Sequence, residues 1–305
     1  MKRKEVFPDF LMPGAQKCGT TSLHAWLGRH PEILMSDPKS PDFLEDDEEY
    51  EKGLDFYWEK YFNKWQGEKL LGESNIRNLY HYYVPERIFS INPEARFLIP
   101  VRNPVDRALS HWWMYYRRGW EQLSFEDGIT ADYERIRNGV DFRDPERRAN
   151  YEREFHPRAS GVCKVFRTYL DCGYYAQQME YYLKFFPAER LKVLMFEDIC
   201  ERPEAVMREV CEFLGADPEE CGGLDHSPEN PARPMRWRRA LSTNGRLLLK
   251  NIFSKDDRAS VVKGLSGIRK SPAMGLETRR WLVEHFKPHN KRLEEIIGKK
   301  LDHWV

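Results

Sequence analysis

The chain has 305 residues, of which 41% are hydrophobic and 13% aromatic, which is enough for a sizeable core and favours one large domain over two. Lysine plus arginine and aspartate plus glutamate both number 49, so the formal net charge is zero and a whole-molecule field that would attract nucleic acid is excluded. No apolar run approaches the length of a membrane span, so no membrane partner is expected.

The first half of the chain alternates strand-like and helix-like segments, which is typical of a doubly wound α/β fold. In chain order the pattern predicts a strand at Phe7–Met12, a helix at Thr20–Leu27, short strands at Ile33–Met35 and Lys69–Leu71, a helix at Pro85–Ile91, a strand at Arg96–Val101, a helix at Pro104–Arg118, a strand at Leu191–Phe196 and a helix at Pro203–Leu214. We therefore expect a P-loop-like three-layer α/β fold, with a central, mostly parallel sheet flanked by helices.

Two regions interrupt this alternation. Residues 119–172 are charged and irregular and are predicted to be an insertion, and residues 222–273 are predicted to be a long loop region. The tail, Gly275–Val305, is predicted to form two helices that break at Lys287–Pro288. Together these segments make up a single predicted domain, 1–305.

A turn bounded by Gly14 and Gly19 lies between the first strand and the first helix. With the hydroxyl of Thr21, it fits the pattern G-x-x-x-x-G-K-[ST], except that Thr20 stands where a nucleoside-triphosphate loop needs lysine. The lysine lies inside the turn instead, at Lys17. Such a turn aims backbone N–H groups and the positive end of a helix dipole at an anion. We predict a 5′-phosphate site rather than an ATP site, formed by Gly14, Lys17, Cys18, Gly19, Thr20, Thr21 and Ser22.

A second block covers residues 96–110, where an apolar strand runs into a helix that opens with Arg-Asn-Pro-Val-Asp-Arg. Arg102 ends the strand and Ser110 lies two turns into the helix, so both can face one anion. A guanidinium group binds phosphate through two parallel hydrogen bonds. Arg107 lies between them, and a structural salt bridge explains it at least as well as ligand binding.

Together the two blocks resemble those of sulfotransferases that use 3′-phosphoadenosine 5′-phosphosulfate (PAPS), in the style of the bacterial and heparan-sulfate-type enzymes. Further segments extend the resemblance over most of the chain: Gly173-Tyr174-Tyr175, Phe196-Glu197-Asp198, Phe213-Leu214-Gly215, and Phe286 to Leu293. The resemblance implies that PAPS gives up its sulfuryl group and leaves as PAP, and that no metal takes part. It implies that Lys17 stabilises the leaving phosphate and that Arg102 and Ser110 bind the 3′-phosphate. It also places Arg269 and Lys270 in a late loop that crosses the cofactor.

The general base is where the chain departs from the resemblance. Heparan-sulfate-type relatives carry a glutamate in a segment like K-E-P-H-F-F, and the matching segment here, Lys39 to Leu44, has Ser40 at the glutamate position. In an extended backbone, positions 40 and 42 point to the same side, so Asp42 is one candidate base. Glu73, at the end of a predicted strand, is the second choice after Asp42.

The residues thus predict a sulfotransferase acting on a hydroxyl group of a glycan or a small-molecule alcohol, with an oligomeric state that the sequence does not define. Two alternatives stay open: a P-loop kinase or NTPase, and a non-catalytic member of the fold that binds nucleotide or carbohydrate. The six cysteines have neither C-x-x-C nor zinc spacing, so reduced thiols are expected. No apolar segment follows the basic start of the chain, which favours the cytoplasm, or the Golgi lumen if a membrane anchor has been trimmed away.

Overall fold

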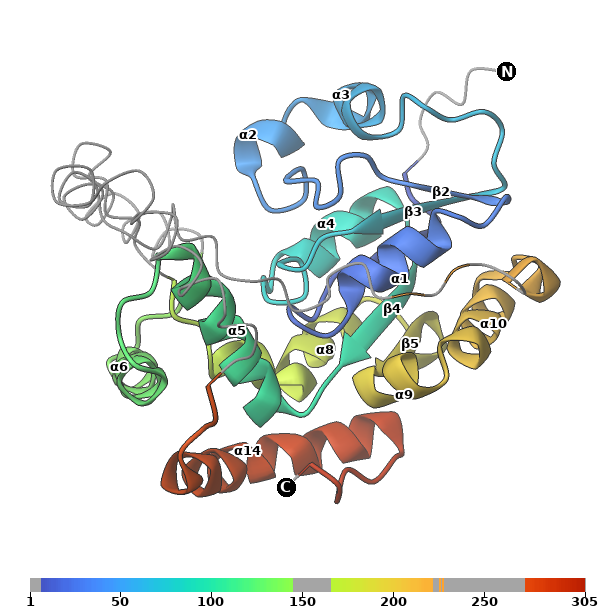
Figure 1. Cartoon of the computed structure of the whole chain (residues 1–305). Coiled ribbons are helices and arrows are strands. Elements are labelled where there is room, and N and C mark those ends of the chain that lie inside the picture. The colour runs from blue at the N-terminus through green and yellow to red at the C-terminus, as the bar shows by residue number, and fades with distance from the viewer. Residues whose placement is uncertain (1–6, 145–165, 222–224, 226, 228–271, 305) are drawn as a thin grey trace, which may run out of the picture. The chain divides into compact units, whose positions relative to one another are not determined.

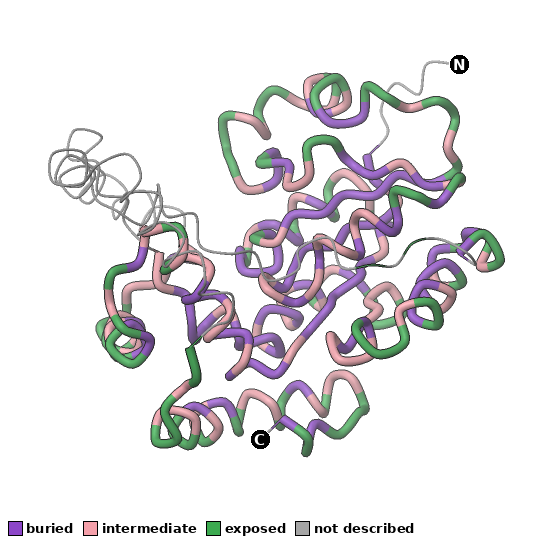
Figure 2. The backbone as a smooth tube through the Cα atoms, in the orientation of Figure 1, coloured by how far each residue is buried: buried purple, intermediate pink, exposed green. Residues whose placement is uncertain are grey.

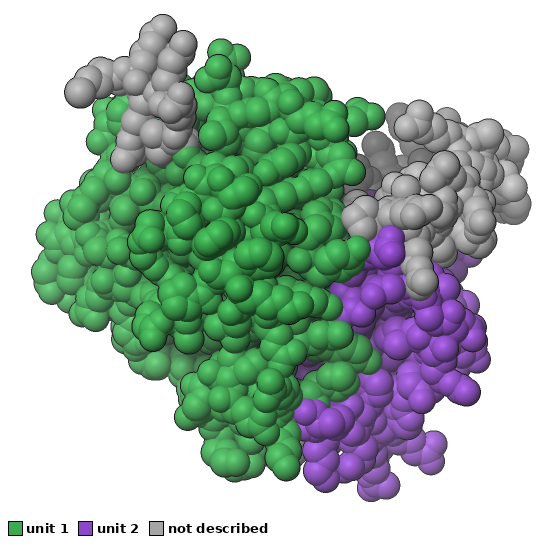
Figure 3. Space-filling model, turned by 180° about the vertical axis from the view of Figure 1, so that it is seen from behind, with its two compact units in different colours: residues 1–103, 174–229, 289–303 green, residues 104–173, 230–288, 304–305 purple. Residues whose placement is uncertain are grey.

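The computed structural model describes residues 7–144, 166–221, 225, 227 and 272–304. The chain divides into two compact units, coloured green and purple in Figure 3. Unit 1 comprises residues 1–103, 174–229 and 289–303, and unit 2 comprises residues 104–173, 230–288 and 304–305.

Unit 1 is built on a five-stranded sheet in which every neighbouring pair of strands is parallel, in the order β2-β3-β1-β4-β5. The strands are β1 (Phe10–Met12), β2 (Ile33–Met35), β3 (Leu70–Ser74), β4 (Arg96–Val101) and β5 (Leu191–Met195). In β1, Leu11 is paired with Glu73 on one side and with Phe97 on the other, so β1 is the central strand. Figure 2 shows that these strands consist mostly of buried residues, which is expected for a parallel sheet covered on both faces.

Helices cover both faces of this sheet (Figure 1). On one face, alternate strand side chains such as Phe10 and Met12 share an apolar cluster with α1 (Thr20–Leu27), α9 (Phe196–Glu201) and α10 (Pro203–Leu214). On the other face, the ring of Phe97 packs edge-on against Tyr182, with ring centres 5.0 Å apart. Tyr182 belongs to α8 (Tyr175–Leu183), and α4 (Val84–Ile91) packs beside it. The remaining short helices of this unit are α2 (Asp47–Tyr50), α3 (Gly53–Tyr61), η2 (Ala188–Arg190) and η3 (Pro218–Cys221).

Unit 2 is helical in its described residues, with α5 (Pro104–Arg118), α6 (Phe125–Arg137), η1 (Asp171–Gly173) and the first part of α14 (Leu276–Ile297). A buried ion-pair group lies inside it, in which Arg135 binds Asp132 at 2.9 Å and Asp171 at 2.6 Å. The ring of Tyr133 on α6 meets Trp281 on α14 edge-on at 5.2 Å. Paired charges and aromatic contacts therefore hold this unit together.

The predicted α/β fold with a central parallel sheet and flanking helices is confirmed, but two local expectations were wrong. The region 119–172 was expected to be irregular, yet it contains α6, whose residues Phe125, Ile129 and Asp132 recur at helical spacing on one buried face. The tail was expected to break at Pro288, yet α14 continues through it. Apolar residues buried along that helix, among them Phe286 and Leu293, offset the hydrogen bond that a proline removes.

No helix within the described ranges combines the length and the apolar character that a membrane crossing needs.

Candidate functional site

The candidate site lies at the carboxyl ends of the parallel strands of unit 1. After β1 the chain moves to β2 and β3 on one side of β1, and after β3 it crosses to β4 on the other side. Open α/β sheets bind ligands at such a reversal, in the crevice beyond the strand ends. The predicted phosphate turn follows β1 and Arg102 follows β4, so both flank this point.

The turn after β1 has the backbone geometry of a tight anion-binding loop. Gly19 has φ 88° and directly precedes α1, a conformation that glycine adopts without steric cost. A side chain at Gly14 would come within 2.9 Å of Leu79 Cβ, so only glycine fits there. Lys17 also has positive φ, at 71°, which is uncommon for a residue with a long side chain and is typical of functional turns. Since α1 has no acidic residue in its first turn, the positive end of its dipole is not offset locally.

Lys39 is a site residue that the sequence interpretation missed. Its ammonium group donates hydrogen bonds to the hydroxyls of Thr20, at 3.3 Å, and Thr21, at 3.0 Å, where α1 begins. Burial, and then the nearby positive charge of Lys17, lower the pKa of Lys39 to about 8. Two lysines and a helix N-terminus therefore converge on one place. The only signal in the sequence was that Lys39 begins the Lys39–Leu44 segment. That segment had been considered only as a source of the catalytic carboxylate.

The positive charge of Lys39 also acts on His24, which lies on the next turn of α1. Burial, followed by the charge of Lys39 and opposed by that of Asp37, lowers the pKa of His24 to about 4. The imidazole is therefore neutral at physiological pH and adds no further charge to the site.

Arg102 and the turn meet at one aromatic ring. The guanidinium of Arg102 lies over the ring of Phe196, 4.6 Å from its centre, and the open side of Gly19 faces the same ring. Phe196 is the first residue of α9, directly after β5. On α8, the hydroxyl of Tyr175 donates to the backbone oxygen of Arg102 at 2.9 Å and lies 3.6 Å from Cys18 Sγ. The ends of three adjacent strands thus bring the turn and Arg102 together in unit 1.

The other predicted donor-binding residues are not tested by this geometry. Ser110 lies half-buried on α5 in unit 2, whereas Arg102 belongs to unit 1, so their joint use on one anion stays a prediction. Arg107 is fully buried in unit 2 and donates hydrogen bonds to the backbone oxygen of Tyr169 and to His111 Nδ1, as expected for a structural residue. Arg269 and Lys270 lie outside the described residues.

The two candidate bases occupy opposite environments. The carboxylate of Asp42 is 53% exposed and is paired with Arg77. The carboxyl group of Glu73 is buried at the end of β3, where it accepts hydrogen bonds from the hydroxyl of Tyr57 and from Asn78 Nδ2, the latter at 3.1 Å. Burial is the main cause that raises the pKa of Glu73 to about 8, and the two hydrogen bonds act against it.

The extended backbone expected around Asp42 is not formed. Ser40 has φ 67°, so the segment after β2 turns instead of running straight. The backbone N–H of Ser40 donates to the oxygen of Ser74, and Asn75 Nδ2 donates to the oxygen of Pro41, which ties the segment to the end of β3. The same-side argument for positions 40 and 42 was therefore wrong. This turn also explains why Lys39 lies at α1.

Comparisons with known proteins agree with this geometry. Residues 7–230 match the family model described as "Sulfotransferase domain". The chain is 27% identical to mouse bifunctional heparan sulfate N-deacetylase/N-sulfotransferase 1 and 26% identical to the human form 3, over all of this chain but only 31% and 32% of those proteins. It thus spans about a third of the length of these curated relatives. A crystal structure of a sulfotransferase from Alicyclobacillus acidocaldarius is 26% identical with a TM-score of 0.67, covering 98% of this chain and 99% of that one.

The chain belongs to the sulfotransferase family, and the family and enzyme class predicted from the sequence are confirmed.

Proposed function

We propose that this protein transfers a sulfuryl group from PAPS to a hydroxyl group on a glycan or a small-molecule alcohol. The observation that carries the proposal is the shared contact of Gly19 and Arg102 with Phe196, because it joins two cationic, anion-binding segments at the switch point of the sheet. PAPS carries anionic groups at both ends of its ribose, which suits two such segments. The match of residues 7–230 spans parts of both units and supports a single sulfotransferase domain.

In the proposed reaction the acceptor oxygen attacks sulfur in line, and the bond from sulfur to the bridging phosphate oxygen breaks. Negative charge then grows on that oxygen, and Lys17 stabilises it from the turn. Lys39, with Thr20 and Thr21, holds the 5′-phosphosulfate beside Lys17. Arg102 binds the 3′-phosphate, with Ser110, Arg269 and Lys270 as further proposed contacts. PAP leaves, and no metal is needed.

Of the two carboxyl groups, Glu73 has the properties that suit a general base better. Its pKa of about 8 lies near a neutral working pH, and the ionised form, which can accept a proton, increases as the pH rises toward 8. Asp42 is exposed and ion-paired, so its proposed role is limited to guiding the acceptor.

The two alternatives have less support. An NTPase would need an acidic residue after an apolar strand to hold Mg²⁺, and the candidate after β5, Asp198, is engaged by Arg202 at 3.2 Å and Lys299 at 3.5 Å. A non-catalytic role was suggested by Ser40, but the backbone of Ser40 is hydrogen-bonded to Ser74, the neighbour of Glu73, and Lys39 directly precedes it, so both a carboxyl group and an ammonium group belong to adjoining residues.

The relatives are named as heparan sulfate N-sulfotransferases, which supports a glycan acceptor but refers to transfer to nitrogen, so the hydroxyl group rests on the sequence interpretation. A glycan acceptor is therefore our first choice, and the cytoplasm, expected from the sequence, is our proposed compartment. The test is to incubate the protein with ³⁵S-labelled PAPS and a panel of heparan-type oligosaccharides and simple alcohols, and to titrate it with PAP and with ATP. Labelled product and tighter binding of PAP support the proposal. Mg²⁺-dependent ATP binding tighter than PAP binding would refute it.

A further inference from the structure

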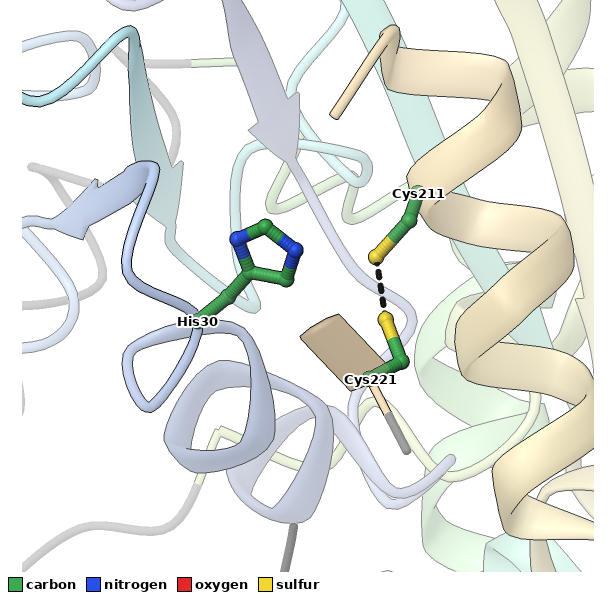
Figure 4. A group of neighbouring side chains, drawn as sticks. All are labelled: His30, Cys211 and Cys221. Carbon is green, nitrogen blue, oxygen red and sulfur yellow. Dashed lines mark hydrogen bonds between the residues drawn. The ribbon is translucent and has the colours of Figure 1, made fainter. Parts of the chain in front are cut away.

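A buried pair of cysteines lies at the amino-terminal ends of the strands, away from the candidate site. Cys211 is in the last turn of α10 and Cys221 ends η3, and both are fully buried within the apolar cluster of unit 1. Their sulfur atoms point at each other and are 2.6 Å apart (Figure 4). His30 lies beside them, and its ligand atom and both sulfurs lie within 4.8 Å of one another.

The distance between the sulfurs can be compared with two kinds of chemistry. A disulfide bond is about 2.05 Å long. Two thiolates on one tetrahedral zinc ion, each about 2.3 Å from the metal, stand roughly 3.8 Å apart. The observed 2.6 Å lies between these two values, and both thiols are free in the structure, so the two sulfur atoms are in contact without being bonded and need only a small movement to form the bond.

The hydrogen bonds of His30 also argue against a metal. Its Nδ1 accepts from the backbone N–H of Glu32 at 3.2 Å, and its Nε2 lies 2.9 Å from the backbone oxygen of Asp217. Since a carbonyl oxygen only accepts, Nε2 carries the proton. Both ring nitrogens are therefore used by the backbone, and neither offers a lone pair to a metal ion.

We propose that Cys211 and Cys221 form a disulfide, making this pair a site of covalent redox modification. The oxidant is a small-molecule disulfide such as oxidised glutathione. One cysteine thiolate attacks it and releases one reduced thiol, and the second cysteine then attacks the mixed disulfide and releases another. Two protons and two electrons leave the protein, and the oxidant gains both.

The crosslink closes a loop that supports the sheet. Backbone oxygens of this loop accept hydrogen bonds from residues at the starts of three strands: Arg96 to Leu214, Lys69 to Gly215 and His30 to Asp217. Closing a loop of this length removes freedom from the unfolded chain and raises the midpoint of thermal unfolding by about 4 °C for a protein of this size.

Exchange is slow in the folded protein. Burial is the main cause that raises the pKa of both thiols, so little of the reactive thiolate is present at neutral pH. The bond therefore forms when the loop opens or while the chain folds. In the reducing cytoplasm proposed above it is transient, and it persists only where the surrounding thiol pool is oxidising.

The test equilibrates the full chain, either folded or refolded from urea, with oxidised glutathione or with dithiothreitol. After acid quenching, free thiols are alkylated in denaturant and the protein is digested with trypsin. Both cysteines lie on the one tryptic peptide that starts at Glu209. After oxidation we expect this peptide to be unalkylated and two hydrogen atoms lighter, and after reduction we expect it to be alkylated twice.

Matched variants complete the design. Cys211→Ser and Cys221→Ser should abolish the difference of about 4 °C between the oxidised and reduced midpoints, whereas Cys200→Ser, at an exposed position on α9, should keep it. Two alkylated cysteines after refolding in oxidised glutathione would overturn the proposal. So would one equivalent of tightly bound zinc that is lost in Cys211→Ser. None of these readouts depends on sulfuryl transfer.

Discussion

Replacing Glu73 by glutamine tests the protonation state that the structure gives this buried carboxyl group. The substitution keeps the shape of the protonated side chain and removes its ionisation. The hydroxyl of Tyr57 can donate to the introduced amide oxygen. Asn78 Oδ1 is buried and accepts no hydrogen bond from the described residues, so it can accept from the introduced amide N–H. We therefore expect the variant to fold.

The magnitude follows from the raised pKa. The pKa of Glu73 rises from an ordinary value of 4.5 to about 8 in the folded protein. Between these two pH values the folded protein keeps a proton that the unfolded chain has released, so the free energy of unfolding falls as the pH rises. Each unit of this shift is worth about 1.4 kcal/mol, so the full loss is about 5 kcal/mol, complete above pH 8 and absent below pH 4.5.

The assay compares urea unfolding of the wild-type protein and Glu73→Gln, followed by tryptophan fluorescence at pH values from 4.5 to 9. Other titrating groups are common to both proteins and cancel in the difference. The variant should gain stability relative to the wild type by about 1.4 kcal/mol per pH unit across the window, then level off. A difference that does not change with pH would show that Glu73 is ionised in the folded state, and the argument for its raised pKa would fail.

Four further outcomes are expected. Lys17→Ala should lower turnover by about 10²- to 10³-fold with an unchanged circular dichroism spectrum, and near-normal turnover would contradict its role at the leaving oxygen. Arg102→Ala should weaken PAP binding about 10- to 100-fold by calorimetry, and an unchanged dissociation constant would contradict its contact with a phosphate. PAP binding by the wild type should weaken about tenfold per pH unit above pH 8 as Lys39 loses its proton, and Lys39→Met should bind weakly with no such slope; an unaltered slope would exclude Lys39 as the titrating group. In sulfate-transfer assays Glu73→Gln should lose at least about 100-fold in turnover and Asp42→Asn only a few-fold, and the reverse order would assign the base to Asp42.

Much of the fold could be predicted because glycine, with its permissive backbone, and proline, with its restricted one, mark the element ends. The predicted bounds of α1 and α10 agree with the structure, since Gly19 begins the first and Pro203 and Gly215 bracket the second. The end of β3 could not be predicted in this way. Glycine, glutamate and serine are poor strand formers, and pairing with β1 places them in the sheet. Intrinsic strand propensity is the poorest guide to structure where tertiary pairing between strands decides the structure.

The candidate site divides along a similar line. Lys17 and Arg102 were found because each follows a recognisable strand: Lys17 lies in the glycine-bounded turn after β1, and Arg102 comes directly after β4. Lys39 was missed because its position depends on the left-handed turn at Ser40, and nothing in the residue types of that segment predicts positive φ at a serine. The contact of Arg102 with Phe196 depends on the order β1-β4-β5, which a single sequence does not define.

The electrostatics of the turn point to an anionic ligand independently of any family resemblance. Lys39 is held at the N-terminus of α1 by two neutral hydroxyl groups, and burial, together with the nearby positive charge of Lys17, lowers its pKa. Asp37, only two residues away, is paired with Lys64. Like charges brought together at a helix N-terminus destabilise the fold, and the left-handed backbone of Lys17 adds strain. A ligand with two or more negative charges removes this repulsion when it binds, and that relief adds to the affinity for the proposed 5′-phosphosulfate. The relief of repulsion gives a physical reason for a second lysine beside Lys17.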